Sequence, residues 1–175
     1  MHKSLPNVFI FADKFSNQIF KNNNTNIGVI YRNYQNTNKE KELIKIAKEC
    51  KRKRYKLFVS NSVKLALKVK ANGVYIPAFN KTKRFINYGK KDFIILGSAH
   101  NQKEINQKIL QKCNAIFLSP IFYVKKRLSY LDVYKFNSLA RSNKTSFFAL
   151  GGISKDDLKT CMANNGYGVS GISKF

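Results

Sequence analysis

The chain of 175 residues contains 33 Lys and Arg against 9 Asp and Glu, which gives it a formal net charge of +24. This length allows a single domain, and a hydrophobic content of 43% with 14 Phe and 9 Tyr is enough to fill a core and to exclude a largely disordered chain. The early apolar segment Val8–Ala12 is too short to cross a bilayer or to serve as a signal peptide. We therefore expect a cytoplasmic protein without a membrane partner.

The cysteines and histidines are too scattered for a metal site or a disulfide framework. Cys50, Cys113 and Cys161 lie far apart in the sequence, and the histidines are His2 and His100. Structural zinc sites use closely spaced Cys and His pairs, and disulfide-rich domains use an even set of cysteines. We therefore expect neither kind of site.

The strong positive charge favours an anionic partner, either a phosphorylated small molecule or a nucleic acid. The basic run Lys51–Lys56 and the triplet Lys125–Arg127 are the best candidates for contacts with a nucleic acid. The first run follows a predicted helix, however, and cations are favoured at helix C-termini. AT-rich coding DNA would also enrich Lys, Asn, Ile, Phe and Tyr together, so a nucleic acid is the less favoured partner.

Eight short apolar segments rich in Val, Ile and Phe alternate with helical patterns along the chain. Such segments are typical of parallel strands that are buried on both faces. The predicted strands are Val8–Ala12, Ile27–Tyr31, Lys56–Val59, Gly73–Ile76, Phe93–Leu96, Ala115–Leu118, Ser146–Leu150 and Gly168–Ser170.

The helical patterns between these strands place their apolar residues on one face. They predict helices over Lys39–Lys53, Asn61–Lys70, Asn101–Lys112, Leu131–Arg141 and Ser154–Ala163, the last with a capping-box arrangement. The alternation of strand and helix predicts an α/β fold, and eight such units predict a small (β/α)8 TIM barrel. An open doubly wound sheet has the same periodicity and stays the alternative.

Two segments depart from a standard barrel. Asp13–Asn26 is a poor helix, and the sequence ends at Phe175 directly after the eighth predicted strand, so we expect a barrel lacking the final helix. An apolar flank left uncovered there would favour a homo-oligomer, because bare apolar faces seldom stay exposed.

Glycine-containing segments follow the seventh and eighth predicted strands. The first carries Gly151 and Gly152 ahead of a predicted helix, and the second carries Gly171. Glycine lets the backbone approach a ligand closely, and a helix start offers free N–H groups. Loops after these two strands form the phosphate site of many TIM barrels. The pattern therefore predicts a bound phosphate, with a tight turn as the alternative.

The strand ends occur in an order that is typical of one family. They are Val29–Arg32, Val59–Ser62, Asn72–Pro77, Leu96–His100, Leu118–Phe122, Ala149–Ile153 and Val169–Ser173. In this series the chain resembles the thiamine-phosphate synthase/TenI family of thiamine biosynthesis. The resemblance implies a phosphorylated small-molecule partner, a thiazole phosphate or thiamine phosphate.

The resemblance also implies a role for each matching residue. Arg32 would be a catalytic residue at the pyrimidine diphosphate, and Arg127 would stabilise the leaving pyrophosphate, with Lys126 as its neighbour. Asn61 would belong to the same site, and the hydroxyl of Ser98 would bind phosphate. The thiazole phosphate would contact mainly backbone at Gly152, Ile172 and Ser173, beside the predicted phosphate loops.

Departures from the family pattern affect the metal. The family's synthases place metal-binding aspartates where this chain has Ser62 and Asn80, and a second cation where it has Tyr34. Mg²⁺ is therefore expected as a cofactor only if synthase activity survives, and no other cofactor is expected. The TenI branch also lacks these acids and has a proline at the position of Pro77, but its aromatising members use a histidine where this chain has Pro120.

Three functions remain open at this point. The leading one is a TenI-like protein that binds a thiazole or thiamine phosphate, with catalysis weak or lost. The second is an active synthase that joins a pyrimidine diphosphate to a thiazole phosphate and releases pyrophosphate, with Lys and Arg partly replacing the metal. The third is a basic nucleic-acid-binding module.

His100 and Asp13 are the remaining polar candidates. His100 is predicted to line the pocket. A catalytic pair with Ser98 is disfavoured, because a spacing of two seldom aligns a nucleophile with its base and no orienting acid is visible. Asp13 would be the only carboxylate that faces the pocket, where it could hold an amine or a metal-bound water, or cap the loop.

Overall fold

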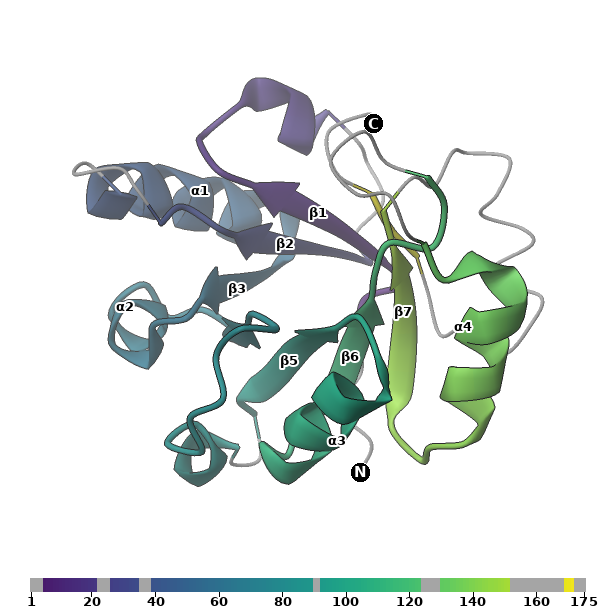
Figure 1. The fold of residues 1–175 in the computed structure, drawn as a ribbon. Coiled ribbons are helices and arrows are strands. Elements are labelled where there is room, and N and C mark those ends of the chain that lie inside the picture. Colours follow the sequence, from purple (N-terminus) through teal and green to yellow (C-terminus); the bar gives the residue numbers. More distant parts are fainter. Residues whose placement is uncertain are drawn as a thin grey trace.

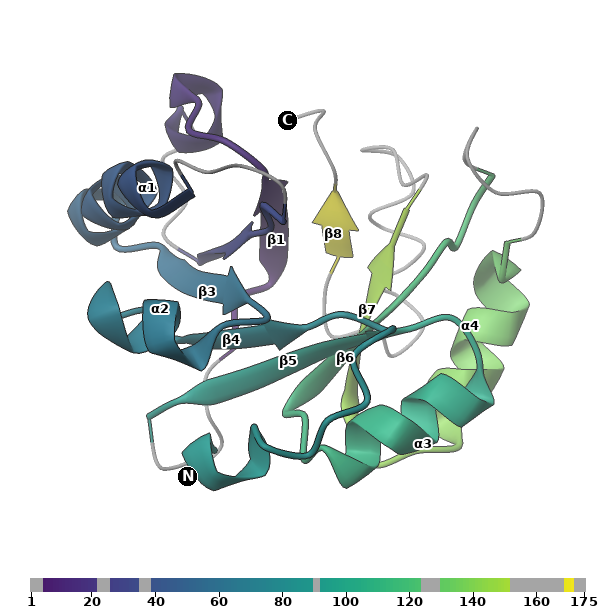
Figure 2. The same ribbon diagram turned by 60° about the vertical axis from the view of Figure 1, so that its left-hand side comes forward.

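The computed structural model describes residues 5–21, 26–34, 39–89, 92–123, 130–151 and 169–171 of the chain. The eight strands of this part are all parallel and pair with one another in chain order. The last strand, β8, pairs with β7 on one side and with β1 on the other, which closes the sheet into a barrel (Figure 2). The predicted TIM barrel is therefore confirmed, and the open-sheet alternative is wrong.

The strands follow the apolar segments closely. They are β1 (Val8–Ala12), β2 (Ile27–Tyr31), β3 (Lys56–Ser60), β4 (Gly73–Ile76), β5 (Ile94–Ala99), β6 (Ala115–Leu118), β7 (Ser146–Leu150) and β8 (Val169–Gly171). The largest difference is in β5, which runs on to Ala99 although its sequence predicts an end at Leu96. Pairing of Ser98 and Ala99 with β6 continues the strand, because tertiary hydrogen bonding outweighs the weak strand propensity of Gly97 and Ser98.

The helices lie on the outside of the barrel (Figure 1). They are α1 (Lys39–Lys53), α2 (Val63–Lys68), α3 (Gln102–Leu110) and α4 (Asp132–Arg141), with short 3-10 helices η1 (Asn17–Phe20) and η2 (Ile86–Tyr88). α2 and α3 begin later than predicted because Ser62 and Asn101 act as N-caps, whose side chains accept the backbone N–H groups of Leu65 and Glu104. The predicted helix Ser154–Ala163 lies outside the described residues. None of the helices within the described ranges is long and apolar enough to cross a lipid bilayer.

Aromatic side chains fill the interior of the barrel. The ring of Phe9 lies 4.8 Å from that of Phe148 and 5.0 Å from that of Phe117, and both contacts are edge to face. Gly28 is paired with Phe9, and a β-carbon at this glycine would come within 2.5 Å of the Phe9 ring. The glycine therefore leaves the space that the larger side chain fills. The buried inner cluster also contains Phe11, Ile30, Phe58, Tyr75, Ile94, Leu96, Ala115 and Leu150.

The outward faces of the strands pack against the helices in two further clusters. One lies between β1–β3 and α1 with α2, and the other lies between β4–β7 and α3 with α4. Cys50 and Cys113 belong to these clusters as free, buried thiols. Burial raises the pKa of each thiol to about 12, so both stay protonated and unreactive near neutral pH.

Candidate functional site

Several candidate residues lie at one end of the barrel. Because all strands are parallel, their carboxyl ends meet at a single rim, which we call the mouth. Arg32 follows β2, Asn61 follows β3, Ser98 lies near the end of β5 and Gly151 follows β7. The fold therefore gathers residues that are far apart in the sequence.

Arg32 is held at the mouth by contacts with the end of β1. Its backbone N–H donates to the carbonyl of Ala12 at 2.8 Å. Its guanidinium carbon lies 5.1 Å from the centre of the Phe11 ring, and its Nε lies 3.7 Å from Oδ1 of Asp13. The Arg32 side chain is 30% exposed and that of Asp13 is 69% exposed. Arg32 can thus present a partly covered cation to an anionic ligand, and Asp13 is its ion-pair partner.

Tyr34 occupies the position where the resemblance implies a second cation, and its ring packs against that of Phe79. The Tyr34 hydroxyl lies 2.8 Å from Oγ of Ser60, and the ring of Tyr34 meets that of Phe79 edge to face at 6.0 Å. Burial raises the pKa of Tyr34, so the phenol stays neutral. The Phe79 side chain is 69% exposed and offers an apolar face to a planar ring. The sequence pattern did not identify Phe79 as a candidate. Its only signal in the sequence is that it is a large aromatic residue shortly after the end of a strand.

Asn61 and Asn80 form an amide pair at the mouth. Asn61 has a φ of 60°, a left-handed conformation that asparagine tolerates better than most residues. Its backbone N–H donates to the carbonyl of Tyr75 at 2.8 Å, and its Oδ1 accepts a hydrogen bond from Nδ2 of Asn80. Oδ1 of Asn80 accepts in turn from the backbone N–H of Thr82 at 2.9 Å. Both amides are therefore fixed by hydrogen bonds.

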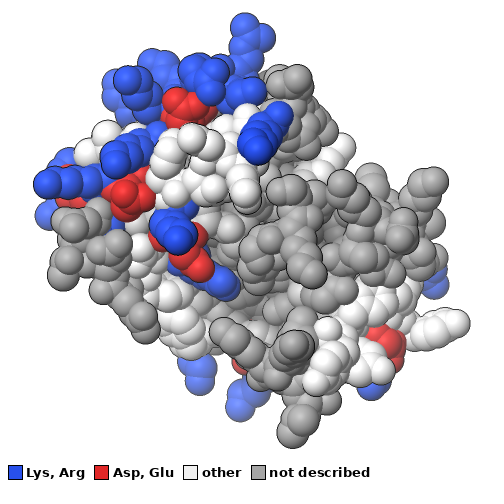
Figure 3. Space-filling model, turned by 90° about the horizontal axis from the view of Figure 1, so that it is seen from above, with Lys and Arg blue, Asp and Glu red and all other residues white. Residues whose placement is uncertain are grey.

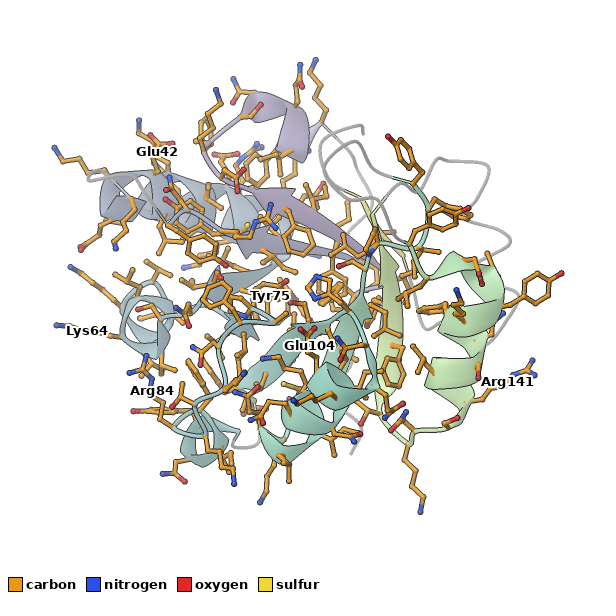
Figure 4. The ribbon with its side chains drawn as sticks, viewed as in Figure 1. Glu42, Lys64, Tyr75, Arg84, Glu104 and Arg141 are labelled. Carbon is orange, nitrogen blue, oxygen red and sulfur yellow. The ribbon has the colours of Figure 1, made fainter. Side chains whose placement is uncertain are left out.

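Tyr75 and Ser98 lie beside this pair, near the ends of β4 and β5. Both side chains are buried, and Figure 4 shows Tyr75 near the centre of the barrel. Burial raises the pKa of Tyr75 to about 12, against the opposing effect of a hydrogen bond with Ser98. The Tyr75 phenol is therefore a neutral group that hydrogen-bonds with Ser98, and the phosphate-binding role of Ser98 stays a prediction.

His100 is oriented by Glu104, which corrects the expectation that no acid accompanies it. Oε2 of Glu104 lies 2.8 Å from Nδ1 of His100 and also accepts the His100 backbone N–H at 2.8 Å. Glu104 lies in the first turn of α3 and near the centre of the view in Figure 4, whereas Lys64, Arg84 and Arg141 lie at its edges. Glu104 is therefore a second carboxylate beside the strand ends, in addition to Asp13. The spacing of four residues across a strand end and a helix start was the signal that could have revealed this pair.

The ring of His100 retains a free nitrogen. Nδ1 donates to the carboxylate, and Nε2 has no hydrogen-bond partner among the described residues. His100 directly follows β5, the strand that carries Ser98 near its end.

Replacement of Glu104 by glutamine is expected to make the free energy of unfolding depend less on pH in the acid range. Partial burial acts to raise the pKa of Glu104, but hydrogen bonds from the ring and backbone of His100 outweigh it and leave that pKa below 4.5. A carboxyl whose pKa is lower in the folded than in the unfolded state stabilises the fold above the unfolded pKa. This contribution, up to about 1 kcal/mol for a partly exposed group, is lost as the pH falls through the folded pKa.

Urea unfolding of both proteins between pH 3 and pH 7 measures this effect. The difference in unfolding free energy between wild type and Glu104→Gln should shrink toward pH 3. A difference that stays constant with pH would show that the carboxylate carries no such contribution.

The ends of β7 and β8 lie side by side, as the predicted phosphate site requires. β7 pairs with β8 through Ala149 with Val169 and Leu150 with Ser170. Gly151 has a φ of 91°, and a β-carbon there would come within 3.2 Å of Pro120. Only glycine suits this backbone without strain. Gly171 is the last residue of β8, not part of a following loop as predicted.

Five of the predicted contact residues belong to other parts of the chain. Lys126, Arg127, Gly152, Ile172 and Ser173 lie outside the described residues. The catalytic role of Arg127 and the contacts of the other four therefore stay predictions. Gly151 and Gly171 are the members of the predicted phosphate loops that the structure places.

The oxygen atoms at the expected metal positions do not fit a Mg²⁺ ion. Oγ of Ser62 accepts the backbone N–H of Leu65 at 3.3 Å as a helix cap, and the amides of Asn61 and Asn80 bind each other. Mg²⁺ is usually held by carboxylates and water. Within the described ranges, no group of three His, Cys, Asp or Glu side chains could hold a metal ion. At the described positions of Ser62 and Asn80, the residues therefore do not match the metal-binding aspartates that the resemblance implies.

The basic run after the first predicted helix is a helix end. Lys51, Arg52 and Lys53 form the last turn of α1, where the helix dipole favours cations. Arg52 pairs with Glu49 at 2.6 Å. Lysine and arginine side chains gather on the side of the molecule where α1 lies, to the left in Figures 1 and 3. The helix dipole thus accounts for the three cations of this last turn, and a nucleic-acid partner stays an untested alternative.

Comparisons of structure reveal the same barrel in proteins of different kinds. Thiamine phosphate pyrophosphorylase from Pyrococcus furiosus superposes with a TM-score of 0.71 at 17% sequence identity, over 96% of this chain and 86% of that one. The glycerol uptake operon antiterminator regulatory protein of Listeria monocytogenes superposes with a TM-score of 0.65 at 10% identity. At these identities the likeness establishes the fold alone.

Comparisons of sequence are more specific. A thiamine-phosphate synthase of Prochlorococcus marinus is 33% identical over 131 residues, which span 72% of this chain and 36% of that longer protein. A protein of Aquifex aeolicus assigned as thiamine-phosphate synthase 2 is 30% identical over 143 residues, 78% of this chain and 77% of its own length. The model of the thiamine monophosphate synthase family (TMP-TENI) matches residues 21–175. With that match over most of its length, the chain belongs to the thiamine monophosphate synthase family.

Proposed function

We propose that the protein binds a thiazole phosphate or thiamine phosphate at the mouth of the barrel, with the phosphate at the ends of β7 and β8 and with weak or lost synthase activity. The observation that carries the proposal is the meeting of Arg32, Ser98, Gly151 and Gly171 at one rim. Parallel barrels bind phosphate at this rim through backbone N–H groups and small side chains. Family membership supports a phosphorylated small molecule as the ligand.

The mouth suits a phosphorylated ring better than a metal-bound diphosphate. Tyr34 and Phe79 offer exposed aromatic faces for a heterocycle, and Arg32 offers a cation for an anion. A diphosphate leaving group needs concentrated positive charge in the transition state. The neutral side chains of Ser62 and Asn80 lack the carboxylates that would hold a metal cation for this purpose, which supports binding with weak turnover.

Replacement of Arg32 by methionine is expected to weaken ligand binding. Arg32 follows β2, which only β1 separates from β8, so loss of its positive charge near the phosphate is expected to lower affinity by roughly tenfold. The measurement is calorimetric titration with hydroxyethylthiazole phosphate. Arg141→Met is the matched control, because Arg141 lies on α4 at the edge of the molecule (Figure 4) and should bind as wild type does.

The same titration separates the proposed function from its alternatives. Absence of binding by the folded wild-type protein would contradict the proposal. Release of pyrophosphate after addition of hydroxymethylpyrimidine diphosphate would identify an active synthase instead. Equal weakening by Arg32→Met and Arg141→Met would indicate attraction by net charge alone, without a defined site.

A further inference from the structure

α3 contains a lysine that is fully buried. Lys108 has no exposed side-chain surface, and its Nζ donates to the carbonyls of Pro77 and Asn80 at 2.8 Å each and to Oε1 of Gln111 at 2.9 Å. An ammonium group has three N–H donors and no acceptor, so these three bonds satisfy it completely. Burial lowers the pKa of Lys108 to about 8, which leaves it mostly charged at pH 7.

β5 leaves space for the Lys108 side chain because it has a glycine at the point of contact. Gly97 of β5 lies against it, and a β-carbon at Gly97 would come within 2.9 Å of Cδ of Lys108 and within 2.8 Å of Sγ of Cys113. Any larger residue at position 97 would therefore displace the lysine stem. A buried charge is costly, so a complete set of partners and a matching gap in the strand indicate a specific role.

Lys108 and Gln111 together hold the segment that follows β4. Nε2 of Gln111 donates to the carbonyls of Asn80 at 3.0 Å and Thr82 at 2.7 Å. The carbonyls of Pro77, Asn80 and Thr82 thus point toward α3, inside the protein. The side chain of Asn80, on the same segment, binds Asn61 at the mouth.

We propose that Lys108 is a positioning residue for the ligand site. Its buried ammonium group holds Pro77–Thr82 so that Asn80 stays against Asn61, at the position where the resemblance implies a metal-binding aspartate. The inference rests on the proposed function for its ligand and on the contacts above for its geometry. The carbonyl oxygens that could bind a hard cation are engaged by α3, and both side-chain amides are engaged by each other. Ligand binding should therefore not depend on Mg²⁺.

The first test needs no ligand. In ¹⁵N NMR spectra, the side-chain amide of Asn80 should exchange its protons with water at least about tenfold faster in Lys108→Met than in wild type, because the segment opens locally more often. Lys103→Met is the control, since Lys103 is an exposed lysine of the same helix, and it should leave this exchange unchanged. The Asn80 signal is identified by its loss in Asn80→Ser. If Lys108→Met does not fold, Lys108→Gln, which keeps a shorter polar donor, serves in its place.

The second test is titration with hydroxyethylthiazole phosphate in EDTA and again in excess MgCl₂. Wild type should bind equally in both, and Lys108→Met should bind about tenfold more weakly in both. Unchanged Asn80 exchange in the variant would overturn the positioning role, and severalfold tighter wild-type binding in MgCl₂ would overturn the replacement of the metal. Absence of any wild-type binding would count against the proposed function, while the exchange experiment would still decide the role of Lys108.

Discussion

Replacement of Phe117 by alanine is expected to lower the free energy of unfolding by about 3–5 kcal/mol, the usual cost of removing a buried phenylalanine ring. Phe117 is fully buried at the centre of the barrel. Its ring lies between 5.0 and 5.9 Å from the rings of Phe9, Phe11, Tyr75 and Phe148. These rings belong to β1, β4 and β7. The strands cannot move inward to fill the space of the missing ring without breaking the hydrogen bonds of the barrel, so a cavity would remain.

Urea unfolding at pH 7 measures this loss. Phe79→Ala is the control, because Phe79 is an equally large side chain on the exposed rim and its removal should change stability by less than about 0.5 kcal/mol. A similarly small effect of Phe117→Ala would mean that the interior rearranges to fill the space. Tyr75 would then be expected to move, and ligand binding at the mouth should change with it.

The fold could be predicted from the sequence because its signals are local. Each strand is a short apolar run between polar helices, so the pattern located β1 (Val8–Ala12) and β7 (Ser146–Leu150) at their observed bounds. The end of β5 could not be found in this way. Gly97 and Ser98 are poor strand residues, and their place in the sheet depends on pairing with β6. Closure through β8 and β1 is likewise a long-range property that periodicity does not contain.

The site was predictable only in part. Strand ends in family order placed Arg32, Asn61 and Ser98 at the mouth, because parallel strands bring their carboxyl ends together. The contacts that α3 makes with His100 and with Asn80 were not predicted. Glu104 and Lys108 lie on α3, and their contacts with His100 and Asn80 depend on how that helix packs against β5 and the segment after β4. In the sequence both read as ordinary charges of an amphipathic helix.

The buried ammonium of Lys108 is expected to make stability rise with pH in the alkaline range. The pKa of this lysine is about 8 in the folded protein and near 10.5 in the unfolded chain. Between these values the unfolded chain binds more protons, so the folded state gains stability as the pH increases. The full change corresponds to the difference in pKa and is on the order of 3 kcal/mol. Below about pH 8 the cost of burying the charge is present in full.

The measurement is the difference in unfolding free energy between wild type and Lys108→Met from pH 7 to pH 10.5. The difference is needed because the raised pKa values of Cys50 and Cys113 lower the stability of both proteins above pH 9. Cys113 and Glu104 are the titratable groups that act on Lys108, and both remain in the variant. Stability of wild type relative to the variant should increase through this range. A flat difference would mean that the three hydrogen bonds of the ammonium compensate for its burial, and the charge that holds Asn80 would then carry no cost to the fold.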